Sequence, residues 1–100
     1  MSLIGIRQRL SGGVTGRRSS PVRHRVTLYT KAGCHLCEDA RDTLLRVRAR
    51  IPFEYEECEI TSDDQLFARY QVKIPVVLID GVERFWYRVN ERRFIRELTA

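Results

Sequence analysis

A pair of cysteines between a predicted strand and a predicted helix constrains this chain more than any other feature. The motif Cys34-His35-Leu36-Cys37 follows the apolar run 26–30 and precedes a segment with helical periodicity. At such a junction the first thiol lies at the helix N-terminus, where unpaired backbone N–H groups and the helix dipole favour a thiolate. A thiolate is the form that attacks disulfides, and two thiols at this spacing can close into a small disulfide. The sequence therefore indicates thiol redox chemistry at this pair.

The segment after the motif is predicted to be an amphipathic helix over about residues 35–50. Its charged residues face away from the apolar ones, and Asp42 and Arg46 are expected to pair across one turn. Ile51-Pro52 ends the helix, because the residue before a proline disfavours the helical conformation. The apolar residues recur at spacings of four, four and three: Leu36, Ala40, Leu44 and Val47.

The remaining patterns predict three further strands and two further helices. The turn Asp80-Gly81 is a strong signal for a two-residue hairpin between the last two strands. Ser62 can cap a short helix, with Gln65 three residues later completing a capping box, and Asn90 can cap the last helix. The buried faces of these two helices are expected to contain Leu66, Phe67 and Tyr70 in one and Phe94, Ile95 and Leu98 in the other. With the first strand included, the predicted strands are 25–30, 53–60, 76–79 and 82–87.

The predicted element order is β-α-β-α-β-β-α, and it fixes a fold class. A right-handed crossover makes the first two strands parallel, and the hairpin adds an antiparallel pair beside them. The expected fold is α/β, with a four-stranded mixed sheet and helices on both faces. We predict this domain over residues 23–100, preceded by a disordered basic tail over residues 1–22.

The net charge of +5 is divided unevenly along the chain. Residues 1–25 carry six arginines and no acidic residue, whereas the other 75 residues carry 12 basic and 13 acidic side chains. The basicity belongs to the tail, which indicates non-specific attraction to polyanions and no specific nucleic-acid partner.

No apolar run approaches the ~18–20 residues that a membrane helix needs. We expect a cytoplasmic monomer with no membrane partner; a mitochondrial location, with the tail as transit peptide, is the minor alternative.

Two segments of the sequence resemble the thioredoxin superfamily, and glutaredoxin-like proteins in particular. Residues 28–37, LYTKAGCHLC, are similar to the glutaredoxin active-site segment, in which a Tyr-x-Lys triplet precedes the two cysteines. Residues 69–76, RYQVKIPV, are similar to the segment that contains the cis-proline of the superfamily. The likeness extends over about residues 24–98 and implies a thioredoxin-like fold.

The resemblance implies roles for the two thiols and for one proline. Cys34 would be the nucleophile and Cys37 the resolving thiol. Pro75 would be the cis-proline, and it would orient backbone groups of Ile74 toward an extended substrate strand, since an imide nitrogen cannot donate a hydrogen bond. The implied activity is that of a thiol–disulfide oxidoreductase that reduces protein disulfides or mixed disulfides.

Two further residues beside the motif are candidates for substrate binding. Lys31 matches a glutaredoxin position that contacts the carboxylate of glutathione, and both Lys31 and His35 are expected to favour a thiolate electrostatically. No tightly bound cofactor is implied. Electrons would come from glutathione, as a co-substrate, or from a thioredoxin-reductase-like protein.

The sequence departs from the glutaredoxin pattern at two places. His-Leu stands between the cysteines in place of Pro-Tyr, and a Gly-Gly pair expected near Trp86-Tyr87-Arg88 is missing. Glycines at that point would let the backbone approach glutathione closely. The resemblance therefore supports thiol chemistry better than it supports glutathione as the partner.

Other interpretations stay open at the level of sequence. A thioredoxin-fold module would hold a partner peptide along Ile74-Pro75 without turnover. The cysteine pair would form half of a zinc site if His24, His35 or Cys58 completed it, and some glutaredoxins hold an intersubunit iron–sulfur cluster. We expect no resident metal, and we expect Cys58 to pack in the core. Trp86 and Tyr87 would either stack on a substrate or pack against the sheet.

Overall fold

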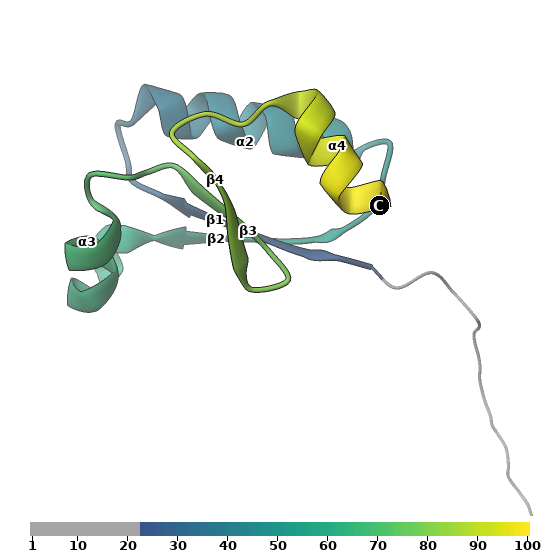
Figure 1. The fold of residues 1–100 in the computed structure, drawn as a ribbon. Coiled ribbons are helices and arrows are strands. Elements are labelled where there is room, and N and C mark those ends of the chain that lie inside the picture. The colour runs from purple at the N-terminus through teal and green to yellow at the C-terminus, as the bar shows by residue number, and fades with distance from the viewer. Residues whose placement is uncertain (1–22) are drawn as a thin grey trace, which may run out of the picture.

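Strand and helix signals alternate along the chain, and residues 23–100, the part that the computed structural model describes, fold accordingly (Figure 1). The predicted tail over residues 1–22 lies outside the described residues. None of the helices in the described part has the length and apolar character needed to cross a membrane. The elements are β1 (Arg25–Thr30), α2 (His35–Arg48), β2 (Glu54–Glu59), a one-turn 3-10 helix (Ile60–Ser62), α3 (Asp64–Tyr70), β3 (Val76–Ile79), β4 (Val82–Trp86) and α4 (Glu91–Thr99).

The four strands form one mixed sheet in the order β2-β1-β3-β4. β1 runs parallel to β2 and antiparallel to β3, and β3 and β4 form an antiparallel hairpin. The hairpin turn has φ of 53° at Asp80 and 84° at Gly81, the left-handed conformation that a two-residue turn of this kind requires at both positions. The predicted fold class, topology and hairpin are confirmed.

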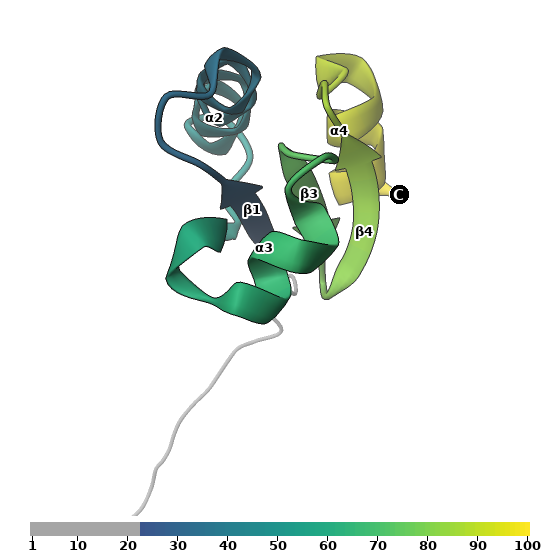
Figure 2. The ribbon, with the colours of Figure 1, turned by 90° about the vertical axis from the view of Figure 1, so that its left-hand side faces the viewer.

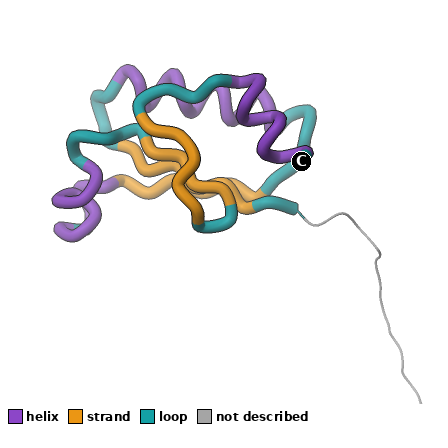
Figure 3. Tube along the Cα trace, in the orientation of Figure 1, coloured by secondary structure: helices purple, strands orange, loops and turns teal. Residues whose placement is uncertain are grey.

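Helices lie on both faces of the sheet and bury two separate apolar clusters. Figures 2 and 3 show α2 and α4 side by side over one face, while α3 lies at one end of the other. Under α3, Tyr70 stacks against Tyr29 of β1 with ring centroids 4.7 Å apart. The cluster under α2 and α4 contains Val26, Leu28, Ala40, Leu44, Val47, Phe53, Val77, Ile79, Phe85, Phe94 and Leu98. Most of the predicted buried stripe of α2 and α4 therefore belongs to one core.

An ion pair between α2 and α4 corrects one sequence prediction. Arg46 donates to the Glu91 carboxylate from Nε at 3.1 Å and from a terminal nitrogen at 2.8 Å. Asp42, the expected partner one turn earlier, makes no ion pair within residues 23–100. The long guanidinium side chain reaches the first turn of α4 because the two helices pack side by side, and two hydrogen bonds to one carboxylate are stronger than a single exposed pair.

The N-terminal cap of α3 lies one residue later than predicted. Asp63 is the N-cap, and its Oδ1 accepts hydrogen bonds from the backbone N–H groups of Gln65 (2.8 Å) and Leu66 (3.0 Å). Ser62 belongs to the preceding 3-10 turn, where its hydroxyl donates to the carbonyl of Glu59 at 2.7 Å. Ser62 was the wrong candidate for the N-cap because its hydroxyl already donates a hydrogen bond within this 3-10 turn.

Candidate active site at the Cys34–Cys37 pair

A tight turn after β1 places the first cysteine at the start of α2. The Cys34 N–H donates to the Lys31 carbonyl at 3.3 Å, which closes a four-residue turn. Gly33, the third residue of that turn, has φ of 80°, as a type II turn requires. A Cβ added at Gly33 would meet no atom within 4 Å, so the constraint on this residue is its backbone conformation and not space.

Replacing Gly33 with alanine is expected to lower the free energy of unfolding by roughly 1–2 kcal/mol, because an L-residue pays about that much in the left-handed region. The Gly33→Asn variant should lose less of the free energy of unfolding, since asparagine tolerates this conformation better than alanine. Urea unfolding of both variants measures the difference. Equal losses for alanine and asparagine would show that the turn does not depend on the left-handed backbone.

Cys34 itself caps α2. Its backbone is extended, with φ of −98° and ψ of 111°, and its sulfur accepts the N–H of Cys37 at 3.2 Å. The Cys34 carbonyl also accepts the first helical hydrogen bond, from Glu38 at 3.1 Å. The half-buried sulfur thus takes the place of an N-cap oxygen, where backbone donors and the helix dipole stabilise negative charge.

Cys37 lies one turn into the helix and is 1% exposed. Burial raises the pKa of the Cys37 thiol, and its hydrogen bond with Cys34 raises it further, while contacts with Thr30 and the Lys31 backbone act in the opposite direction. Both thiols are free. The pair is therefore asymmetric, with a more accessible sulfur at the cap and a protonated one behind it at neutral pH.

We expect iodoacetamide to label Cys34 faster than Cys37 in the folded protein. The Cys37 rate should keep rising at pH values where an ordinary thiol is already ionised, because its raised pKa keeps it protonated there. Mass spectrometry of digested samples, taken across a pH series, gives the rate at each cysteine. The same experiment in urea is the control, since unfolding should make the labelling rates alike. Equal native rates at Cys34 and Cys37 would contradict the asymmetry.

The second segment of the site meets the first at one end of the sheet. The Ile74–Pro75 peptide bond is cis, as the resemblance implied, and Pro75 is buried. Tyr29 of β1 lies opposite Val76 of β3, so Pro75 is level with the end of β1, from which the turn leads to Cys34. The Pro75 carbonyl accepts the N–H of Tyr87 at 2.8 Å, which brings the end of β4 to the same place.

The segment that contains the two cysteines and the cis-proline is matched by a known protein family. The model of the glutaredoxin-like domain (DUF836) matches residues 25–99. The chain belongs to this glutaredoxin-like family. Uncharacterized proteins of Mycobacterium tuberculosis and Mycobacterium bovis are 30% identical to it over 76 residues, which cover 71% of this chain and 78% of theirs.

Two solved structures have the same fold as this chain. A Nitrosomonas europaea protein solved by NMR aligns with a TM-score of 0.70 and 23% identity, covering 82% of this chain and 99% of its own. Thioredoxin from Fasciola hepatica aligns with a TM-score of 0.53 and 21% identity, over 77% and 79% of the two chains. At these identities the likeness shows a shared thioredoxin-like fold.

The side chains of two predicted site residues of the glutaredoxin-like domain contact groups other than the thiols. The His35 side chain is 94% exposed, and its Nδ1 lies 3.9 Å from a carboxylate oxygen of Glu38. The Lys31 ammonium lies 5.9 Å from the centre of the Phe67 ring, on α3. The structure therefore brings Cys34, Cys37, Ile74 and Pro75 to one end of the sheet, while Lys31 and His35 border this group.

Sequence reasoning missed Glu59, which supports the turn before Cys34 from the neighbouring strand. Its Oε1 accepts the Ala32 N–H at 3.1 Å, and its Oε2 accepts the Thr61 hydroxyl at 2.9 Å. The N–H of Ala32 points out of the turn and would otherwise need a water molecule. No local sequence signal predicts this contact, because β2 contains four glutamates. Only the pairing of β2 with β1 places the last of them, Glu59, opposite the end of β1.

The residues of the zinc alternative do not come together into a metal site within residues 23–100. Within residues 23–100, no three His, Cys, Asp or Glu side chains converge in a way that could hold a metal ion. His24 lies at the far end of β1 from the cysteines and pairs with Asp80 at 2.6 Å. Cys58 is half-buried in β2, opposite Tyr29, so it is less enclosed than predicted.

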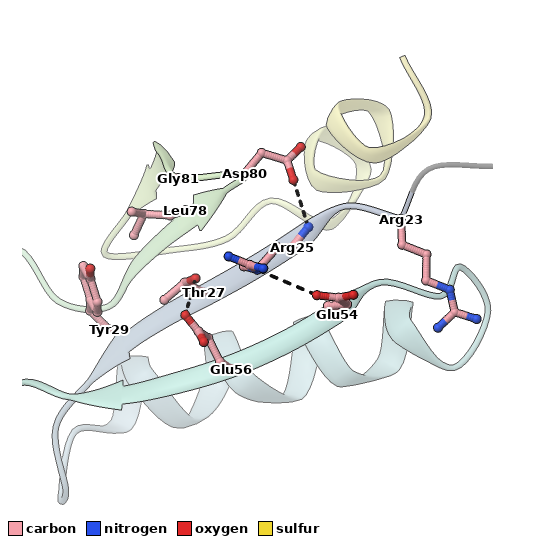
Figure 4. Close-up of a pocket in the computed structure, with 9 residues that line it drawn as sticks. All are labelled: Arg23, Arg25, Thr27, Tyr29, Glu54, Glu56, Leu78, Asp80 and Gly81. Carbon is pink, nitrogen blue, oxygen red and sulfur yellow. Dashed lines mark hydrogen bonds and ion pairs between the residues drawn. The ribbon is translucent and has the colours of Figure 1, made fainter. Parts of the chain in front are cut away.

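A cavity of about 670 Å³ lies along the face of the sheet that carries α3 and extends from Arg23 and Gly81 to Tyr29 (Figure 4). Several of its polar groups bond to one another. Arg25 lies 3.7 Å from Glu54, Thr27 donates to Glu56 at 3.2 Å, and Asp80 accepts the Arg25 N–H at 2.9 Å. The cavity contains neither of the two thiols in its lining, so the dithiol end remains the candidate active site.

Proposed function

We propose that this glutaredoxin-like domain is a thiol–disulfide oxidoreductase that reduces protein disulfides or mixed disulfides with Cys34 and Cys37. The observation that carries the proposal is the N-cap position of the Cys34 sulfur, which accepts the Cys37 N–H at 3.2 Å. Backbone N–H groups and the helix dipole at an N-cap favour the anionic form of a sulfur nucleophile. The buried Cys37 thiol is held one turn away, ready for the second step.

The reaction proceeds in two exchanges. The Cys34 thiolate attacks one sulfur of the substrate disulfide, so the substrate S–S bond breaks, a mixed disulfide forms and the leaving thiolate takes a proton. Cys37 then loses its proton and attacks the Cys34 sulfur, which releases the second substrate thiol and closes a Cys34–Cys37 disulfide. The substrate gains two electrons, and the domain is oxidised by the same two.

A thiol reductant must return the oxidised pair to the dithiol. Glutathione and a thioredoxin-reductase-like protein both supply this chemistry, and a reducing cytoplasm would maintain either one. The Lys31 ammonium is exposed at the edge of the site, and it would attract a carboxylate of glutathione.

The start of β3 is the proposed docking edge for an extended substrate. The N–H of Ile74 already donates to the Tyr70 carbonyl at 3.1 Å. The group that Ile74 can offer a substrate strand is therefore its carbonyl oxygen, and Pro75 has no N–H to donate. A substrate main chain would hydrogen bond to this carbonyl while its sulfur faces Cys34.

The test is mass spectrometry of free and modified thiols after equilibration in a series of glutathione redox buffers. We expect a reversible Cys34–Cys37 disulfide, with glutathione on Cys34 at intermediate potentials if glutathione is a co-substrate. Cys58 serves as the internal reference because it has no thiol at CxxC spacing. If both Cys34 and Cys37 stay reduced and unmodified throughout, the oxidoreductase proposal is wrong.

A peptide-binding module without turnover is the second candidate, and one observation favours it. Trp86 and Tyr87, beside Pro75, are 42% and 50% exposed, and exposed apolar patches mark interaction sites in many proteins. A partner complex that survives Cys34→Ser would support the module, whereas a complex that needs the Cys34 sulfur would support the oxidoreductase.

A further inference from the structure

A small cavity opens beside the dithiol, between the start of α2 and the segment that follows β4. One wall comes from α2 and includes Leu36, the residue before Cys37, so the cavity begins within the cysteine motif itself. Its volume is about 170 Å³. The lining residues are Leu36, Asp39, Ala40 and Thr43 on α2, and Tyr87, Arg88 and Val89 on the opposite wall.

Tyr87, in the second wall, has a backbone conformation that favours glycine. Its φ is 68°, in the left-handed region that bulky residues rarely adopt. Hydrogen bonds on both sides hold it there: Tyr87 donates to the Pro75 carbonyl at 2.8 Å, and Arg88 donates to the Trp86 carbonyl at 2.7 Å. Residues held in such conformations cluster at ligand-binding sites, and this one lies beside the proposed substrate edge.

The size of the cavity limits what it can take. Pockets that enclose a whole small-molecule ligand usually measure roughly 300–1,000 Å³, so about 170 Å³ is room for one side chain and not for a complete tripeptide. The floor is apolar, made by Leu36, Ala40 and Val89. An apolar side chain is therefore the occupant that this floor fits.

The rim of the cavity fits a peptide main chain. Asp39 offers a hydrogen-bond acceptor and Arg88 a donor; both are exposed, and neither forms an ion pair within residues 23–100. A peptide bond presents one donor and one acceptor per residue, which matches this pair. Glutathione carries only glycine and γ-linked glutamate beside its cysteine, and neither has an apolar side chain.

On the premise of the proposed function, we propose that this cavity binds the apolar side chain next to the reacting cysteine of a polypeptide disulfide. Tyr87 is the specificity-determining residue, since it lines the cavity and its backbone is fixed to Pro75. The preferred substrates are then polypeptide disulfides with a residue such as leucine beside the cysteine.

The test compares two disulfide peptides that differ only in leucine or glycine beside the cysteine. For the wild-type domain we expect kcat/KM to be about tenfold higher for the leucine peptide, as a hydrophobic pocket of this size typically gives. Tyr87→Gly should reduce the ratio to about twofold or less, and Tyr87→Phe should preserve it. Arg92→Ala, at an exposed position of α4, is the matched control and should leave the ratio unchanged. Equal kcat/KM for the two peptides in the wild type would overturn the proposal.

Two further measurements separate this proposal from folding defects and from the proposed function. The thermal midpoint of Tyr87→Gly should equal or exceed that of the wild type, because glycine relieves the left-handed backbone. NMR titration with serine analogues of the peptides should shift the amide signals of Leu36, Ala40 and Val89 for the leucine peptide only. Such shifts without any turnover would keep the cavity proposal and refute the oxidoreductase. Turnover with no preference for the leucine peptide and no such shifts would keep the oxidoreductase and refute the cavity proposal.

Discussion

Replacing Cys34 with serine is expected to abolish disulfide exchange, whereas replacing Cys37 should trap a mixed disulfide with the substrate. A serine hydroxyl at the N-cap can accept the same N–H but is not ionised at neutral pH, so the rate should fall by on the order of 10³-fold or more. Without Cys37 the first exchange still occurs, but no internal thiol resolves the product. Both outcomes can be measured by following reduction of a protein disulfide and by mass spectrometry of the trapped adduct.

The third cysteine provides the matched control for this experiment. Cys58→Ser makes the same chemical change at a half-buried position of β2 and should keep exchange close to the wild-type rate. Full exchange by the Cys34→Ser variant would mean that the nucleophile has been assigned wrongly. An adduct of equal amount in the wild type and in Cys37→Ser would show that Cys37 does not resolve the mixed disulfide.

The periodic elements of this fold are predictable because burial of one face imposes a spacing on the sequence. The stripe Leu36, Ala40, Leu44 and Val47 gave α2 to within two residues of its end, and the apolar run at 76–79 coincides with β3. The Asp80-Gly81 turn was equally clear, since few residue pairs adopt two left-handed conformations in succession.

The errors arise where a side chain has two possible partners. Ser62 and Asp63 are both good caps, and only the 3-10 turn that occupies the Ser62 hydroxyl decides between them. Arg46 has an acidic residue one turn before it on its own helix, but the packing of α4 offers Glu91, 45 positions later in the chain. Local patterns cannot rank such choices, because the competing partner becomes available only after folding.

In the candidate site, too, features set by local sequence were predicted, whereas features set by tertiary contacts were missed. The two thiols and Pro75 lie in contiguous motifs, so their positions were predicted, whereas the left-handed turn at Gly33 was not. The support from Glu59 and the left-handed Tyr87 depend on strand pairing and on a hydrogen bond to Pro75. A tyrosine gives no local indication that its backbone will adopt a conformation suited to glycine.

Removing the Phe94 ring is expected to cost roughly 3–5 kcal/mol of the free energy of unfolding, the typical range for a buried Phe→Ala change. Phe94 is 0% exposed, and its ring packs edge-on against Phe53 at 5.6 Å and Phe85 at 6.1 Å between centroids. It thus joins α4 to the segment before β2 and to β4. Since small domains are stable by only about 5–15 kcal/mol, the variant should be close to unfolding at moderate urea concentrations.

Leu45→Ala, a truncation at a 41%-exposed position on α2, is the control for Phe94→Ala and should cost well under half as much. Urea unfolding followed by circular dichroism gives both free energies. α4 forms no part of the turn that places Cys34, so labelling of Cys34 in the folded Phe94→Ala variant should stay close to the wild-type rate. A loss below about 1 kcal/mol would place Phe94 outside the core. A large loss with normal Cys34 labelling would show that the aromatic cluster stabilises the sheet and α4, while the turn and the α2 cap position the thiol on their own.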